Sequence, residues 1–184
     1  MKKIHSYIIL VSIFLLSFAF TCEEKCHGNS SFNISKEKYF IKTSDATFNQ
    51  NDTLWLQSKI PVKIKNLDGF THEIKTNGFY HNISAKIKTN FNTYSYIDFG
   101  NFIIPSIGNP YNSTQGILSN YIKKDAHFEF KFGLILKQKG SYKLETEDKI
   151  QIYGNEVTDG CDTGGYHIPL EFDNTTTTFN FLVN

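Results

Sequence analysis

Apolar and polar residues alternate one by one along several stretches of this 184-residue chain, which predicts strands and argues against long helices. The clearest stretch is residues 127–137, whose apolar face consists of Phe128, Phe130, Phe132, Leu134 and Leu136. The other face carries charged residues, including Glu129 and Lys131. Because successive side chains of a strand point to opposite faces of a sheet, we expect Phe130 to be buried and Lys131 to face outward.

The same alternation recurs in two further stretches. In residues 53–60, three aliphatic residues oppose Trp55, Gln57 and Lys59. In residues 79–89, His81 falls on the apolar face, so we expect it to be a hydrogen-bonded core residue. Shorter candidate strands are residues 39–43, 95–99, 141–147, 149–153, 167–172 and 177–183. Residues 116–123 offer the one place for a short helical turn.

Turn signals rich in Gly, Asn, Asp and Pro separate these stretches, as at Thr76-Asn77-Gly78 and Gly108-Asn109-Pro110. About nine short strands with regular turns predict an all-β fold, a single β-sandwich over residues 39–184. A closed barrel is the alternative. The chain lacks the Gly-x-Trp stretch with which a lipocalin-type barrel usually opens, since Trp55 follows Asn51-Asp52-Thr53-Leu54.

Two short stretches resemble known families. Residues 139–145, KGSYKLE, resemble the penultimate strand of immunoglobulin-like domains, in which a Tyr follows a Gly turn at a sheet corner. This resemblance implies an immunoglobulin-like β-sandwich of about eight to nine antiparallel strands. Residues 51–61 resemble Bacteroidota-type surface lipoproteins with one β-sandwich, a group without a characterised activity.

The N-terminus predicts export of the chain. Lys2 and Lys3 precede an apolar run over residues 7–20, so we expect residues 1–21 to be a signal peptide, with an uncleaved membrane anchor as the alternative. Two cleavage sites compete. Ser17-Phe18-Ala19 would release a soluble chain beginning at Phe20, whereas Ala19-Phe20-Thr21-Cys22 resembles a bacterial lipobox, in which the Cys is lipidated. The acids after Cys22 resemble a surface-export signal of the Bacteroidota.

The chain has three cysteines, and an odd thiol is a liability in an oxidising compartment. Lipidation of Cys22 would leave Cys26 and Cys161 free to form a disulfide. That bridge would close a loop of more than a hundred residues and contribute roughly 4–5 kcal/mol to stability. We therefore predict a lipid at Cys22, a Cys26–Cys161 disulfide and a polar tether over residues 22–38. A local Cys22–Cys26 bridge is the alternative.

Several chemistries find little support. The formal charge is +1 and the chain contains no Arg, so we expect no nucleic-acid binding. The triplet Asp162-Thr163-Gly164 of aspartic proteases occurs once and does not follow an apolar strand. The six histidines are scattered, and acids near Asp159 offer only a weak calcium motif, so we expect neither metal nor cofactor.

Aromatic side chains are the candidates for binding. We expect Trp55, Tyr94 and Tyr96 to contact a ligand, because aromatic faces stack on sugar rings and anchor protein interfaces; the alternative is that they fill or flank the core. The sequence thus predicts a non-catalytic lipoprotein, anchored in the outer membrane or at the cell surface. Its partners would be the membrane and a glycan or an envelope protein. The alternative is a secreted hydrolase with an unrecognised active site.

Overall fold

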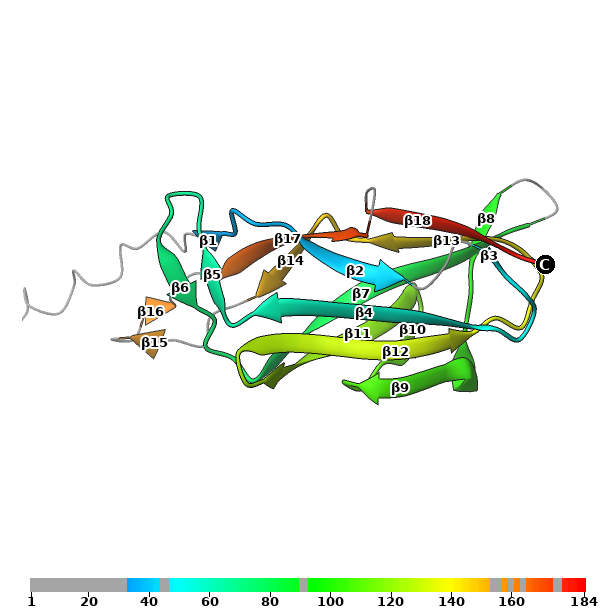
Figure 1. Ribbon diagram of the computed structural model, residues 1–184, viewed down its shortest axis with the longest axis horizontal. Coiled ribbons are helices and arrows are strands. Elements are labelled where there is room, and N and C mark those ends of the chain that lie inside the picture. Colours follow the sequence, from blue (N-terminus) through cyan, green and yellow to red (C-terminus); the bar gives the residue numbers. More distant parts are fainter. Residues whose placement is uncertain are drawn as a thin grey trace, which may run out of the picture.

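The computed structural model describes residues 33–43, 47–89, 93–152, 157–158, 161–162, 165–173 and 177–184. Their regular secondary structure consists of strands, joined by turns and loops, and of one 3₁₀ turn, η1 (Gly100–Phe102), which confirms the predicted all-β fold (Figure 1). The strands are β1 (Asn33–Ile34), β2 (Tyr39–Thr43), β3 (Thr47–Phe48), β4 (Thr53–Pro61), β5 (Lys63–Lys65), β6 (Thr71–Glu73), β7 (Gly78–Lys88), β8 (Tyr94–Tyr96), β9 (Ile103–Ile107), β10 (Tyr111–Ser113), β11 (Gly116–Lys124), β12 (His127–Ile135), β13 (Gly140–Thr146), β14 (Lys149–Ile152), β15 (Val157–Thr158), β16 (Cys161–Asp162), β17 (Tyr166–Phe172) and β18 (Thr178–Val183).

Fourteen of these strands join one hydrogen-bonded sheet, in the order β1-β17-β2-β4-β12-β11-β7-β13-β18-β3, with β8, β9, β10 and β14 as side branches. The pairs β5–β6 and β15–β16 stand apart as small two-stranded sheets. The structure therefore differs from a sandwich of eight to nine antiparallel strands. It has more strands in one sheet, and β1–β17, β17–β2 and β18–β3 pair in parallel. Alternation assigns a strand's faces but not its neighbours, which long-range pairing decides.

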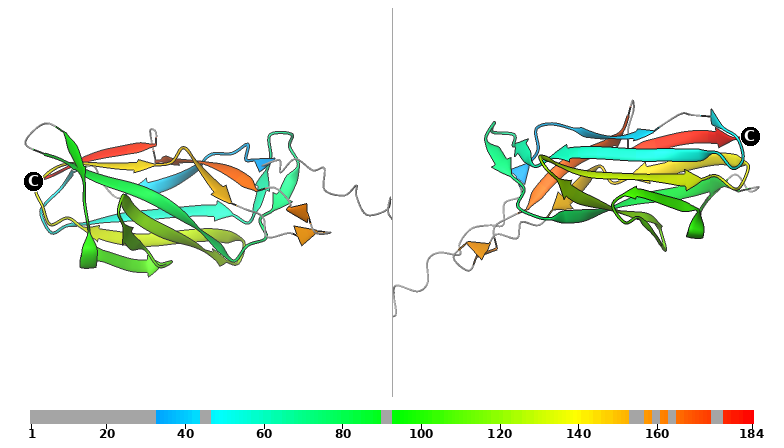
Figure 2. Two further views of the ribbon diagram at one scale, coloured as in Figure 1. Left: turned by 180° about the vertical axis from the view of Figure 1, so that it is seen from behind. Right: turned by 60° about the horizontal axis from the view of Figure 1, so that its bottom comes forward.

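The sheet curls around one core. β13, β17 and β18 lie on one side of the molecule and β9, β11 and β12 on the other (Figures 1 and 2). Strands β17 and β18 stand far apart in the hydrogen-bonded order, yet the ring centroids of Phe172 and Phe179 lie 5.9 Å apart. Side-chain packing thus brings the two halves of the sheet together without a hydrogen-bonded ladder between these strands.

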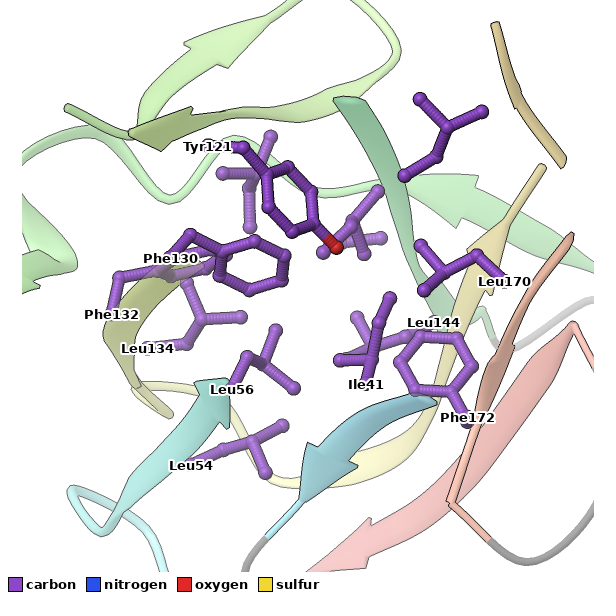
Figure 3. Close-up of a cluster of buried hydrophobic side chains, with 14 of the residues drawn as sticks. Ile41, Leu54, Leu56, Tyr121, Phe130, Phe132, Leu134, Leu144, Leu170 and Phe172 are labelled. Carbon is purple, nitrogen blue, oxygen red and sulfur yellow. The ribbon is translucent and has the colours of Figure 1, made fainter. Parts of the chain in front are cut away.

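The core follows the predicted faces. Phe128, Phe130 and Phe132 of β12 are fully buried, while Lys131 faces outward, as alternation predicts. Figure 3 shows the rings of Tyr121 and Phe130 among the aliphatic side chains that fill the interior. The Phe130 ring packs edge-on against Tyr121, with centroids 4.7 Å apart. The outward-facing Glu129 is also buried, because ion pairs with two lysines cover it.

The expected helical turn at residues 116–123 is wrong, since this stretch forms β11. Ile117, Ser119 and Tyr121 alternate inward, but a serine at a buried position hides the apolar pattern. The Ser119 hydroxyl is satisfied by donating a hydrogen bond of 3.1 Å to the His81 carbonyl oxygen. Among the residues that the structure describes, no helix has the length and apolar character required to span a membrane.

Candidate functional site

The outer face of β2, β4 and β12 contains two adjoining hollows, with volumes of about 360 and 320 Å³. They share Lys42 and Gln57 in their linings. We call this surface the lysine–tryptophan face and define it by Lys38, Phe40, Lys42, Trp55, Gln57, Lys59 and Lys131. Both volumes lie near the lower end of the range of small-ligand sites, about 300–1,000 Å³.

Strand register aligns the centre of this face. Lys42 of β2 lies opposite Gln57 of β4, and Gln57 lies opposite Lys131 of β12. Because neighbouring strands are about 4.8 Å apart, the two lysine backbones are separated by roughly 10 Å with the glutamine between them. The row therefore places two ammonium groups on either side of one amide.

Trp55 flanks this row on β4, where it lies opposite Gly133 of β12. A Cβ atom at Gly133 would lie 3.4 Å from two atoms of the indole ring and 2.6 Å from Thr53 Cγ2. The missing side chain at Gly133 thus leaves room for the indole to cover the strand. Lys131 Nζ lies 5.4 Å from the indole centroid, which is a cation–π distance. Trp55 consequently flanks the sheet on its outer face and does not fill the core.

The lysines of the face differ in their partners. Lys38 Nζ donates to Glu171 Oε1 at 2.7 Å, and Lys59 Nζ lies 3.0 Å from Glu129 Oε2. Lys42 and Lys131 have no carboxylate partner among the described residues, so uncompensated positive charge gathers at the central row.

Glu129 lies on the same outer face of β12 and pairs with lysines there. Burial would raise the pKa of Glu129, but hydrogen bonds and ion pairs with Lys59 and Lys124 lower it below its usual value. The carboxylate therefore stays ionised and occupied by these two lysines. The carboxylates that border the described face are thus engaged in ion pairs, and none is free to act as a general base.

Tyr94 and Tyr96 lie elsewhere. They belong to β8, which pairs with β7, and β7 is separated from β4 by β11 and β12 in the sheet order. Lys143 Nζ lies 5.8 Å from the Tyr94 centroid and Lys86 Nζ lies 5.1 Å from the Tyr96 centroid. Both lysines form ion pairs with Glu145. The two tyrosines therefore form a separate cluster, in which both lysines share the carboxylate of Glu145.

The cysteine predictions fall mostly outside the described residues, since Cys22 and Cys26 both precede Asn33. Cys161 lies in β16, where its backbone pairs with Thr158 of β15. This small hairpin lies at the same end of the molecule as β1 (Figures 1 and 2). The Cys26–Cys161 disulfide and the lipid at Cys22 remain predictions.

No group of three His, Cys, Asp or Glu side chains suited to a metal ion occurs within the described part of the chain. Of the Asp162-Thr163-Gly164 triplet, the structure describes only the backbone of Asp162, in β16.

Comparison with known proteins adds no relative, because no family model, curated protein or solved structure matches this chain. The candidate site therefore rests on its own geometry.

Sequence patterns identified Trp55 and its outward face, but they missed that Lys42 and Gln57 lie in one row with Lys131. The pairing of β2 with β4 brings these residues together, and no local sequence motif predicts this pairing.

Proposed function

We propose that this protein is a non-catalytic, lipid-anchored surface protein that binds an acidic glycan at the lysine–tryptophan face. The observation that carries the proposal is the row Lys42–Gln57–Lys131 beside Trp55. Ammonium groups bind carboxylates through charge-assisted hydrogen bonds, and an indole presents an apolar face to a sugar ring. A glutamine amide can both donate to and accept from sugar hydroxyls.

The dimensions favour a glycan over a protein partner. A stable protein interface buries about 800 Å² on each partner and centres on a desolvated aromatic anchor. The lysine–tryptophan face offers instead two small hollows joined at Lys42 and Gln57, with polar groups along their length. Two adjoining hollows suit consecutive sugar units of a chain that bears carboxylates.

The body that presents this face is proposed to be a variant of the immunoglobulin-like sandwich. Support comes from the stretch that suggested the resemblance. The Tyr142 hydroxyl donates a hydrogen bond of 2.7 Å to the carbonyl oxygen of Gln138, four residues upstream, at the start of β13. Immunoglobulin-like domains contain a comparable tyrosine corner, whose hydroxyl bonds back to the backbone a few residues earlier.

Variants of the face test glycan binding. By calorimetry, we expect a uronic-acid oligosaccharide to bind, and a neutral oligosaccharide of the same length to bind much more weakly. Trp55→Ala should lower the affinity about tenfold or more, since it removes an aromatic anchor. Lys42→Gln combined with Lys131→Gln should lower it by about 10- to 100-fold and reduce its dependence on salt.

Lys88→Gln provides the matched control, because Lys88 is an exposed lysine of β7 outside the face. It should leave the affinity unchanged. Equal binding of the acidic and neutral oligosaccharides, or equal loss with Lys88→Gln, would contradict the proposal. Thermal melting of each variant shows whether the fold is intact.

The anchor is tested at Cys22. Lipidation there predicts that Cys22→Ser releases the protein from the membrane fraction, because the acyl chains no longer hold it. Mass spectrometry of the mature N-terminus should show an acylated Cys22 in the parent chain. An unmodified parent chain that begins at Phe20 would show that the ordinary signal peptidase processes it.

A further inference from the structure

Two large apolar side chains stand in solvent at the tip of the β5–β6 hairpin. Leu67 is 62% exposed and Phe70 is 68% exposed, the highest values among the large hydrophobic residues that the structure describes. The hairpin is separate from the large sheet and projects at one end of the molecule (Figure 1). Paired exposed hydrophobic residues of this kind mark a contact surface more often than a single one does.

Hydrogen bonds fix the backbone of the turn that carries these side chains. The backbone N–H of Asn66 donates to the Phe70 carbonyl oxygen at 2.9 Å, and the backbone N–H of Phe70 donates to Asn66 Oδ1 at 2.9 Å. Gly69 takes a positive φ of 87°, which its missing side chain permits, and its N–H donates to the Asn66 carbonyl oxygen. The tip is therefore preorganised, so a contact would order little additional chain.

The tip lies beside the first described residues of the chain. The Leu67 N–H donates to the Ile34 carbonyl oxygen at 3.1 Å, and Ser35 forms a β-bridge with Asn66. Ile34 is itself exposed and extends the apolar surface. We call Ile34, Leu67 and Phe70 the apolar tip.

The length of chain between the anchor and the apolar tip identifies the surface that the tip would meet. Asn33 follows Cys22 by eleven residues, so the intervening segment can span at most about 40 Å even if fully extended. If Cys22 carries the proposed lipid, the apolar tip is confined to the vicinity of the bilayer. This step rests on the anchor that we propose above.

The charges around the tip are compatible with a lipid surface. Lys36, Lys63 and Lys65 are exposed there and can reach lipid phosphates, while Glu37, Asp68 and Glu73 balance them. The neighbourhood is thus close to neutral, and apolar insertion, more than net charge, would drive the contact.

We propose that Ile34, Leu67 and Phe70 insert into the interfacial region of the membrane that carries the anchor. The docked tip would fix the orientation of the molecule, so that the lysine–tryptophan face is held in a defined direction above the lipid.

Tryptophan fluorescence tests this insertion, because Trp55 is the single tryptophan of the chain and lies away from the tip. The full-length protein, purified with its anchor, is reconstituted into phosphatidylethanolamine–phosphatidylglycerol vesicles that contain brominated lipid. With Phe70→Trp, we expect blue-shifted emission and about a twofold loss of the added signal to the bromines, since interfacial residues sit about 5–10 Å deep. The emission of the parent protein, which comes from Trp55, should not be quenched by the brominated lipid.

Tyr111→Trp is the matched control, because Tyr111 is a half-exposed aromatic of β10, outside the tip. It should show no quenching. The double variant Leu67→Ser, Phe70→Ser should stay folded, but its apolar tip should no longer fix the orientation of the molecule on the membrane. If the protein floats with the vesicles and Phe70→Trp is not quenched, the insertion is wrong while the anchor stands. If the protein does not float, the anchor and the insertion are both wrong, and glycan binding can still be measured in solution.

Discussion

Replacing Phe130 with alanine should lower the free energy of unfolding by about 3–5 kcal/mol. The Phe130 side chain is fully buried in the middle of β12 and contacts two rings, Tyr121 at 4.7 Å and Phe132 at 5.4 Å between centroids. The ladders of β4 and β11 hold the surrounding backbone, so the sheet cannot collapse into the space that is left. The loss therefore contains both the transfer of the ring to water and the cavity.

Urea denaturation measures this loss, and the neighbouring residue provides the control. Lys131→Ala should change the free energy of unfolding by at most about 1 kcal/mol, because Lys131 faces outward and contributes one cation–π contact with Trp55. Similar losses for the two variants would show that the faces of β12 are wrongly assigned.

A second large effect should come from pH. His81 is buried on β7, and burial lowers its pKa from 6.5 to about 4. Its Nε2 shares a hydrogen bond of 2.6 Å with the Thr146 hydroxyl. Between pH 6.5 and about 4 the unfolded chain binds a proton at this histidine and the folded protein does not. Stability should therefore fall as the pH falls through this window, by roughly 3 kcal/mol in all.

Thermal melting between pH 7 and pH 4.5 tests this dependence. His81→Gln should be less stable at neutral pH, but its free energy of unfolding should depend less steeply on pH. The difference in slope should reach about 1.4 kcal/mol per pH unit. His127→Gln, at an exposed position of β12, controls for the loss of a titratable side chain. Ionised Glu129 and Glu145, whose pKa values are lowered in the folded protein, also contribute stability that is lost in acid. That loss occurs mainly as the pH falls below 4.5, the usual pKa of a glutamate. An unchanged slope in His81→Gln would contradict the assignment.

The sequence predicts side-chain faces well and partners poorly. Alternation correctly placed Phe130 inward, Trp55 outward and His81 in the core with a hydrogen bond, because the two-residue period is a local property of the strand. It failed at β11, where Ser119 occupies a buried position. The order of the strands depends on pairings between distant segments, which no local pattern encodes.

The candidate site shows the same division. An aromatic residue on an outward face could be recognised from its neighbours, and so could the lysine of β12. The alignment of Lys42 with Gln57 follows only from the register of β2 with β4. The position of the Trp55 indole next to Gly133 follows only from the register of β4 with β12. A glycine within an alternating strand, such as Gly133, is the one local signal that could have indicated a cross-strand aromatic.

The parallel pairing of β2 with β17 has a consequence for the order of folding. Tyr39 lies opposite Leu170, more than a hundred residues later in the chain. The short strand β3 likewise pairs with the distant strand β18. During synthesis the early strands therefore have open edges until almost all of the sequence has emerged. Contacts between such distant segments form slowly, because the closure of a long loop must precede them. The sheet of such a chain is therefore completed only after almost all of the sequence has been synthesised, which would suit the export that the proposed lipid anchor requires.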